Sequence, residues 1–374
     1  MYNRNNIENA KRIVIKVGTS TLTHHTGKLN FWRIEKLVRE MSDLANQGKE
    51  ILLVTSGAVG AGMERLGLKE KPKTIPEKQA AAAVGQGILM HTYAKLFAEY
   101  GQTAAQVLLT REDSVKRSRY TNSRNTLLSL LKMGVIPVIN ENDAVAIDEL
   151  KIGDNDTLSA MVASIVDADV LIILSDIEGM YNDNPQKNPE AVLISEIADI
   201  TPEIEGLAGG AGSLRGTGGM FTKVQAGKIA VNSGVAMIIA SGMREGVLRD
   251  ILKGESVGTL FLSKENRLQI RKRWLAFGAR TCGMITIDKG CEKALLTGSS
   301  LLAAGIKKVD GDFEHGNTVG IMTLEGREIA RGIANYNSEE TKKIQGLHTY
   351  EITEVLGTKP YDEIIHRDNL VLLI

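Results

Sequence analysis

The sequence has very little cysteine and no net charge. Its 374 residues include only Cys282 and Cys291, and no histidines accompany them at metal-ligand spacing. We therefore expect reduced packing thiols rather than a zinc site or a disulfide framework. The 45 Lys and Arg residues are balanced by 45 Asp and Glu residues. This balance excludes a general attraction to nucleic acid or anionic membranes, although it leaves room for a local patch.

Long apolar runs are missing as well. No run approaches the roughly 18 residues that a membrane-spanning helix needs. The segment from Met1 to Arg12 is polar and rich in asparagine, unlike a signal peptide. We therefore expect no membrane partner and a cytoplasmic location. A hydrophobic fraction of 43% is that of a globular protein, and the length suggests two domains.

Short apolar runs alternate with helical patterns from Arg12 to about Ser263. Each run is bounded by turn-forming residues, as expected for strands that are buried on both faces. Strand–helix alternation of this length predicts an α/β fold, a three-layer sandwich with a mostly parallel central sheet, over residues 1–263. The predicted strands are residues 13–17, 51–54, 105–109, 135–139, 170–174 and 235–240.

Two of the intervening helices have recognisable ends. Apolar residues recur at helical spacing between residues 34 and 45, with Asn30 as the expected N-cap and Gly48 as the stop. A second helical pattern covers residues 158–165, and Asp156 is expected to cap it.

The pattern changes after Ser263. Charged residues cluster in 264–274, which we interpret as a linker. Shorter strand-like runs follow, separated by Gly, Asp and Asn, and they predict a small β-rich domain over residues 275–374. These runs are residues 283–287, 305–309, 318–324 and 328–332.

Polar loops follow most of the predicted strands of the first domain. Ligands in open parallel sheets bind beyond the carboxyl ends of the strands, so these loops are expected to converge on one site. The loops are residues 16–20, 55–62, 140–143, 153–156, 175–176 and 216–223.

The loop from Gly216 to Lys223 has the composition of a phosphate site. Its glycines free backbone N–H groups to contact an anion, and the following helix directs its positive end toward the same place. Lys223 adds a full charge, and Lys16 ends a buried apolar strand, where a charge is costly unless it is used or paired. The chain lacks the P-loop, the dinucleotide G-x-G-x-x-G pattern and the protein-kinase motifs. These features favour a nucleotide site of another design, in which two lysines and Mg²⁺ assist phosphoryl transfer.

The absence of histidine from these loops suggests which group accepts the phosphoryl group. A hydroxyl acceptor needs a general base, whereas a carboxylate is already ionised at neutral pH and needs none. None of the six histidines lies in these loops. The sequence therefore favours a carboxylate acceptor, although an aspartate could serve as a base. Taken singly, a glycine-rich loop, Ser56-Gly57, Asp143 and Asn155 could also be ordinary turn or cap residues.

Several motifs together resemble the amino acid kinase superfamily. They are Lys-Val-Gly-Thr-Ser at 16–20, Val-Thr-Ser-Gly-Ala at 54–58, Asn-Glu-Asn-Asp at 140–143, Gly-Asp-Asn-Asp at 153–156 and Gly-Thr-Gly-Gly-Met at 216–220. The tail, with Gly-Ser-Ser-Leu-Leu at 298–302 and Leu-Glu-Gly-Arg at 324–327, resembles a PUA domain. The resemblance covers essentially the whole chain. It is greatest to the branch of the superfamily that phosphorylates glutamate.

This resemblance implies ATP-dependent phosphorylation of the γ-carboxylate of L-glutamate with Mg²⁺, which gives γ-glutamyl phosphate and ADP. By position, Lys16 and Lys223 flank the phosphates and Asp156 holds the two lysines. The residues implied for L-glutamate are Ser56, Gly57, Asp143 and Asn155. The residues implied for ATP are Lys16, Ser175, Asp176, Thr217, Gly218, Gly219, Met220, Phe221, Thr222 and Lys223. No metal ligand is assigned.

The same resemblance implies the first step of proline biosynthesis, feedback inhibition by L-proline and a homo-oligomer. Two positions depart from the family pattern, because Phe221 replaces a usual serine and Ser175 stands where threonine is frequent. The alternatives are a sister kinase acting on another small acid or on a nucleoside monophosphate, and an RNA-binding protein. RNA binding by the tail is disfavoured, because residues 271–374 contain as many acidic as basic side chains.

Overall fold

The computed structural model describes residues 2–24, 26–110, 113, 117–145, 154–185, 187–209, 219–263 and 281–373. The chain divides into two compact units. One comprises Met1–Val115 with Asn122–Arg267, and the other comprises Leu268–Ile374 with Lys116–Thr121. The expected linker at 264–274 lies outside the described residues, so the domain boundary at Ser263 stays a prediction.

The first unit is built on a mostly parallel sheet, as predicted. Its strand order in the described part of the chain is β3-β4-β2-β1-β5-β7-β8-β6. Neighbouring strands are parallel except for β7 and β8, which are antiparallel. The strands are β1 Arg12–Val17, β2 Glu50–Thr55, β3 Thr103–Leu109, β4 Val135–Glu141, β5 Val170–Ser175, β6 Glu196–Ile197, β7 Ala236–Ser241 and β8 Thr259–Phe261.

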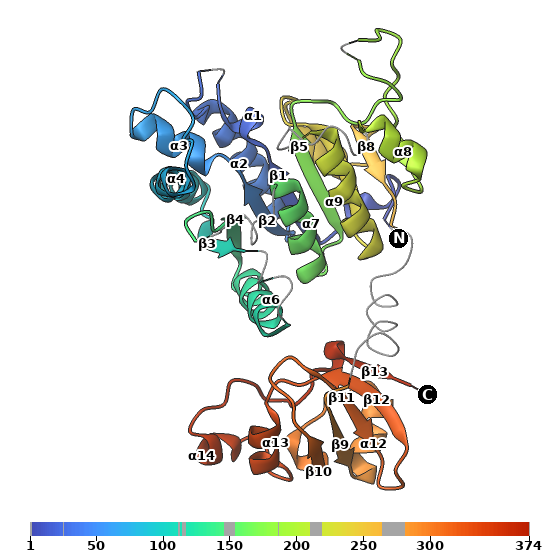
Figure 1. The fold of residues 1–374 in the computed structure, drawn as a ribbon. Coiled ribbons are helices and arrows are strands. Elements are labelled where there is room, and N and C mark those ends of the chain that lie inside the picture. Colours follow the sequence, from blue (N-terminus) through green and yellow to red (C-terminus); the bar gives the residue numbers. More distant parts are fainter. Residues whose placement is uncertain are drawn as a thin grey trace. The chain divides into compact units, whose positions relative to one another are not determined.

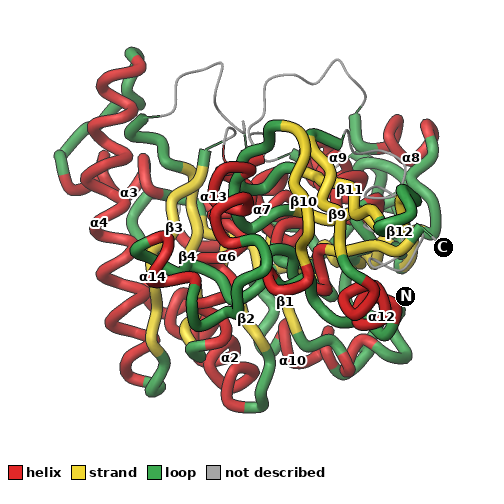
Figure 2. Tube along the Cα trace, turned by 90° about the horizontal axis from the view of Figure 1, so that it is seen from below, coloured by secondary structure: helices red, strands yellow, loops and turns green. Residues whose placement is uncertain are grey.

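Helices cover both faces of this sheet, which confirms the predicted three layers (Figure 1). Helices α7 and α9 pack against each other on one face, and α2 packs against β2, α4 and α10 on the other. The long helix α4 packs on α3 and β3 and is seen along its length in Figure 2. The described helices are η1 Ile7–Asn9, α1 Thr19–Leu22, α2 Phe31–Asn46, α3 Ala58–Arg65, α4 Ile75–Glu99, α6 Arg117–Lys132, α7 Asn155–Ile165, α8 Pro202–Leu207, α9 Met220–Asn232 and α10 Val247–Leu252.

The central strand β1 divides its side chains between the two faces. Ile13, Ile15 and Val17 belong to the hydrophobic core that also contains the buried face of α2. Because side chains alternate along a strand, Lys16 points to the opposite face, where α7 packs on β1. A buried lysine is thereby placed at the carboxyl end of the strand beneath α7.

The capping residue of α7 differs from the prediction. Asp154, not Asp156, is the N-cap: its backbone is extended, and its Oδ1 accepts a hydrogen bond from the Thr157 N–H at 2.8 Å. Asp156 already lies inside the helix and is fully buried. Its carboxylate is therefore available for another role. By contrast, the predicted cap of α2 is confirmed, since the Asn30 side chain accepts from the Arg33 N–H.

The second unit is small and β-rich, as expected, but it also carries short helices. Its strand order among the described residues is β10-β9-β11-β12-β13. It encloses its own hydrophobic core, which includes Ile285, Ile321 and Tyr336. The elements are β9 Gly283–Ile287, α12 Lys289–Leu296, η3 Ala303–Gly305, β10 Ile306–Gly311, β11 Thr318–Met322, β12 Glu328–Ile333, α13 Ser338–Ile344, α14 Ile352–Leu356, η4 Arg367–Asn369 and β13 Leu370–Leu372. Within the described parts of both units, no helix combines the length and the apolar character that crossing a bilayer requires.

Candidate active site

A polar cavity of about 360 Å³ lies at the carboxyl ends of the central strands. Its wall comes from several elements that parallel β-strands bring to one edge. The contributors are Lys16 with the start of α1, Ser56 after β2, the first residues of α7, Ser175 and Asp176 at the end of β5, and Lys223 of α9. Four of the six predicted loops, 16–20, 55–62, 153–156 and 175–176, reach this cavity, as does the end of the 216–223 loop at Lys223, whereas the 140–143 loop does not.

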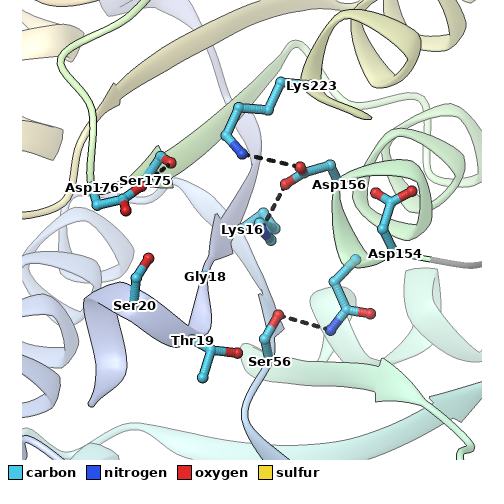
Figure 3. A pocket seen from close by; sticks show the side chains of 11 residues that line it. Lys16, Gly18, Thr19, Ser20, Ser56, Asp154, Asp156, Ser175, Asp176 and Lys223 are labelled. Carbon is cyan, nitrogen blue, oxygen red and sulfur yellow. Dashed lines mark hydrogen bonds and ion pairs between the residues drawn. The ribbon is translucent and has the colours of Figure 1, made fainter. Parts of the chain in front are cut away.

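Two lysines and one aspartate form the centre of the cavity (Figure 3). The Nζ atom of Lys16 lies 2.6 Å from Oδ1 of Asp156, and Nζ of Lys223 lies 3.2 Å from Oδ2 of the same residue. The lysine side chains are 7% and 3% exposed, and that of Asp156 is 0% exposed. One carboxylate therefore contacts the amino groups of both lysines, and all three side chains line the cavity.

The electrostatics follow from this burial. Burial would raise the pKa of Asp156, but Lys16 and Lys223 outweigh it and hold that pKa below its ordinary value. Burial lowers the pKa of Lys223, and the attraction of Asp156 offsets only part of this effect. Asp156 is thus ionised at neutral pH, and the two lysine side chains are held where a polyanion could pair with them.

Thr222 supports the same aspartate. Its hydroxyl lies 2.8 Å from Oδ2 of Asp156 and 2.8 Å from the carbonyl oxygen of Gly219. Gly219 is the N-cap of α9, so the positive end of that helix lies next to Lys223. Of the residues implied for ATP, Met220, Phe221 and Thr222 lie in the first turn of α9 but not on the described wall of the cavity. Thr217 and Gly218 lie outside the described residues.

The end of β5 supplies the opposite wall with Ser175 and Asp176, two of the residues implied for ATP. Ser175 and Asp176 both line the cavity, and the Ser175 hydroxyl donates to Oδ1 of Asp176 at 3.0 Å (Figure 3). Serine keeps the hydroxyl that threonine has at this position in the family pattern, so the substitution leaves this contact possible.

Ser56 and Asn155, two of the residues implied for glutamate, meet in the same cavity. Nδ2 of Asn155 lies 3.0 Å from the Ser56 hydroxyl oxygen and 2.6 Å from the Thr55 carbonyl oxygen. Gly57 is the N-cap of α3 and has φ at +100°, a left-handed conformation that favours glycine. The chain can therefore turn sharply from β2 into α3 while Ser56 stays on the wall.

The structure does not bring Asp143 into this cavity. Asp143 lines a second cavity of about 330 Å³, together with Glu141, Gln86 and the start of α3 at Ala58. Hydrogen-bonded amides connect the two cavities. Asn140 Oδ1 accepts from Asn155 Nδ2 at 2.9 Å, and Asn140 Nδ2 donates to Gln86 Oε1 at 2.8 Å.

Sequence reasoning did not assign a role to several residues of these walls. Asp154 lines the first cavity, and burial together with the nearby Asp156 carboxylate raises its pKa. Thr19 and Ser20 line it as well. The loop positions of these three residues were a usable signal. Gln86 lies within a helix rich in alanine and glycine, and a polar residue on a buried helix face was the signal for it.

A metal site made by the protein alone is not found in the described part of the chain, where no group of three or more His, Cys, Asp or Glu side chains could hold an ion. Asp154 and Asp176 are single carboxylates on the cavity wall. Mg²⁺ is commonly held by one or two carboxylates together with substrate phosphates. The donor set therefore fits an ion that arrives with a nucleotide.

Comparison with known proteins gives matches along both units. The Amino acid kinase family matches residues 11–241, and the PUA domain matches residues 283–356. The glutamate 5-kinase of Moorella thermoacetica is 57% identical over 98% of this chain and 97% of its own length. That of Caldanaerobacter subterraneus subsp. tengcongensis is 55% identical over 97% of this chain and 98% of its own. Among solved structures, the UMP kinase from Bacillus anthracis aligns with 68% of this chain and 97% of its own at a TM-score of 0.48 and 17% identity.

Proposed function

Because the chain belongs to the amino acid kinase family, we propose that it is a glutamate 5-kinase, which transfers the γ-phosphoryl group of ATP to the γ-carboxylate of L-glutamate. This reaction is the first step of proline biosynthesis. The observation that carries the proposal is the buried Lys16–Asp156–Lys223 cluster at the edge of the sheet. Glutamate 5-kinases align with this chain over nearly its full length at 57% and 55% identity, which supports the choice of glutamate over other small acids.

The chemistry follows from the charges of the cluster. An oxygen of the γ-carboxylate attacks the γ-phosphorus, the bond to the β,γ-bridging oxygen breaks, and the electron pair leaves with ADP. The carboxylate is already ionised at neutral pH, so no proton has to be removed. Lys16 and Lys223 stabilise the negative charge on the transferring group and on the leaving oxygen. Asp156 keeps the two ammonium groups together in the absence of substrate.

Asp154 and Asp176 are the carboxylates that would hold Mg²⁺ when it accompanies ATP into the cavity. Bound there, the ion supplies further positive charge against the phosphate oxygens.

A substrate panel tests the proposed function. With ATP, Mg²⁺, L-glutamate and hydroxylamine, the protein should form γ-glutamyl hydroxamate, because hydroxylamine traps an acyl phosphate. N-acetylglutamate and UMP should give no turnover under the same conditions. Turnover of either of these, with none of glutamate, would contradict the proposal.

Asp143 provides a prediction about substrate binding. We propose that its carboxylate pairs with the α-ammonium group of glutamate, away from the reacting end. Asp143→Ala should therefore raise the KM for glutamate about tenfold or more and change kcat little. Steady-state kinetics at saturating ATP measure this, with Asp43→Ala on the exposed side of α2 as the control. A loss of kcat at unchanged KM would place Asp143 at the phosphoryl group instead.

L-Proline shares an α-carboxylate and an α-nitrogen with glutamate, and we propose that it inhibits by occupying the region of Asp143 and Asn155. Inhibition should then weaken as glutamate concentration rises. Initial rates over a matrix of both concentrations measure this, with pyrrolidine, which lacks the carboxylate, as the control. Inhibition that is indifferent to glutamate would place the inhibitor at another site.

The second unit is predicted to be dispensable for the chemistry. It has its own sheet and core, and the described residues that line the cavity belong to the first unit. A chain ending at Ser263 should therefore still form γ-glutamyl hydroxamate, although an exposed apolar surface could lower its solubility. A soluble, folded truncation without kinase activity would show that the PUA domain completes the site.

A further inference from the structure

We propose that Gln86 of α4 is a positioning residue for the amino acid substrate. It orients the amide of Asn140 and, through Asn140, the amide of Asn155 on the wall of the active-site cavity. The inference rests on the proposed function, because it takes Asn155 to be a ligand of glutamate. It extends the site to a helix that contributes no residue to the wall of that cavity.

The three amides form a chain whose direction is set at each link. Oε1 of Gln86 accepts from Nδ2 of Asn140 at 2.8 Å. This bond commits the amino group of Asn140 to Gln86. The Glu141 backbone N–H donates to Asn140 Oδ1 at 2.9 Å, and the two bonds together hold that oxygen toward Asn155, whose Nδ2 lies 2.9 Å away. A side-chain amide has one carbonyl oxygen and one amino group, so the orientation of each amide determines that of the next.

Asn155 is the last of the three amides and lies on the wall of the active-site cavity, where a substrate can contact it. Nδ2 of Asn155 has three acceptors within 3.0 Å, which are Asn140 Oδ1, the Thr55 carbonyl oxygen and the Ser56 hydroxyl oxygen. The carbonyl oxygen of Asn155 is therefore the group that remains for a donor, such as the α-ammonium of an amino acid. If the amide of Asn155 rotated, an amino group would face that ammonium instead and repel it.

Close packing holds Gln86 at a defined distance from Asn140. Helices α3 and α4 cross at Gly62 and Gly85, where an added Cβ atom would lie 1.8 Å from the Ala81 carbonyl oxygen and 1.7 Å from the Ala58 carbonyl oxygen, respectively. Neither helix can therefore shift much relative to the other. Gln86 follows Gly85 directly and is 9% exposed, and Asn140 is 2% exposed.

The amino group of Gln86 indicates that the function of this side chain lies in its carbonyl oxygen, Oε1. Nε2 of Gln86 is buried and has no hydrogen-bond partner among the described residues. A buried donor without a partner costs free energy, which an apolar side chain of similar size would avoid. What glutamine supplies and leucine or methionine cannot is Oε1, the acceptor for Asn140.

The test uses the full-length enzyme and the variants Gln86→Met and Gln86→Leu, both of which remove the acceptor and suit a buried helix position. Each should raise the KM for glutamate about tenfold, the scale of one lost hydrogen bond. Values of kcat and of the KM for ATP should stay within about twofold of wild type. If either folded variant keeps the wild-type KM for glutamate, the inference is wrong.

A matched control separates positioning from stability. Tyr93 lies two helical turns after Gln86 on the same buried side of α4, and its hydroxyl is 2.9 Å from the Thr55 hydroxyl. Tyr93→Phe removes a buried hydrogen bond between α4 and the sheet but leaves the amide chain intact. It should lower the melting temperature without raising the KM for glutamate. An equal rise of KM in Tyr93→Phe would reduce the role of Gln86 to fold stability.

A double-mutant cycle with Asn140→Ala tests the route of the effect. If Gln86 acts through Asn140, the double variant should have the same KM for glutamate as Asn140→Ala alone. If the two substitutions instead raise the KM for glutamate by the product of their separate effects, Gln86 does not act through Asn140. The outcome for the proposed function is read separately, because it fails only if the wild-type enzyme itself forms no γ-glutamyl hydroxamate.

Discussion

Replacing Lys223 with alanine is expected to lower kcat by roughly a hundredfold or more, the scale of losing one preorganised charge at the reacting group. Lys223 is buried, pairs with Asp156 and stands at the start of α9, where the helix end adds to its field. The Lys223 side chain is 3% exposed, so water does not replace its ammonium group when the side chain is removed. The KM for glutamate should change far less than kcat, because Ser56 and Asn155 remain in place.

Lys228 of the same helix is the matched control. It pairs with Glu205 at 2.6 Å and its side chain is 34% exposed, so Lys228→Ala should leave kcat near the wild-type value. Steady-state assays at saturating ATP and glutamate compare the two variants. A kcat of Lys223→Ala within about threefold of wild type would remove Lys223 from the reaction centre.

The pH dependence of wild-type kcat should reflect the titration of Lys223. Burial lowers the pKa of Lys223, and the ammonium is the form that stabilises the transferring group. The rate should therefore fall on the alkaline side below about pH 10.4, the ordinary lysine value. Because the folded-state pKa lies below the unfolded value, the contribution of Lys223 to stability rises with pH in that window. An alkaline limb no lower than that of a free lysine would contradict the geometry.

Asp156→Asn is expected to have the second large effect, on stability as well as rate. The change leaves two buried ammonium groups facing each other without their carboxylate. Breaking a buried ion pair in this way costs about 3–5 kcal/mol of unfolding free energy. Because the lysines should also separate, kcat should fall about as far as in Lys223→Ala. Thermal unfolding monitored beside the assay measures both effects.

Asp154→Asn is the control for this change, because asparagine is as good an N-cap as aspartate and α7 keeps its first hydrogen bond. Its stability should stay within about 1 kcal/mol of wild type.

The pH dependence of stability should also differ between wild type and Asp156→Asn. The pKa of Asp156 is lowered, so its contribution to stability is present above about pH 3.9 and is lost as the pH falls through the folded-state value. Asp156→Asn should lack that acid limb. Equal stability of the two variants would contradict the cluster.

Much of the fold could be predicted because its central strands are buried on both faces. Runs such as 13–17 and 170–174 are almost wholly apolar, and they coincide with β1 and β5 to within one residue. The short strands β6 and β8 were missed. They contain two and three residues, and their pairing is a tertiary contact that no local pattern records. The helices of the second unit were missed for a related reason, since segments as short as α14 show little periodicity.

The candidate site was predictable where a residue lies at the carboxyl end of a strand or directly after it. Lys16, Ser56 and Ser175 are examples, because parallel strands deliver their ends to one edge. Two kinds of feature could not be predicted in this way. The capping role went to Asp154 rather than Asp156, because the exact start of a helix depends on backbone angles that composition does not determine. The link from Gln86 to Asn140 joins residues far apart in sequence and depends on the crossing of α3 and α4.

The identity of the attacking atom is the most direct test of the proposed reaction. L-Glutamate labelled with ¹⁸O in its γ-carboxylate is incubated with the enzyme, ATP, Mg²⁺ and hydroxylamine, and the released phosphate is analysed by mass spectrometry. If the γ-carboxylate attacks the γ-phosphorus, hydroxylamine later displaces phosphate at the carbonyl carbon, and that phosphate carries one ¹⁸O atom. Phosphate released with glutamate present but free of ¹⁸O would show that the carboxylate is not the acceptor. That result would contradict phosphoryl transfer to glutamate at the Lys16–Asp156–Lys223 cluster.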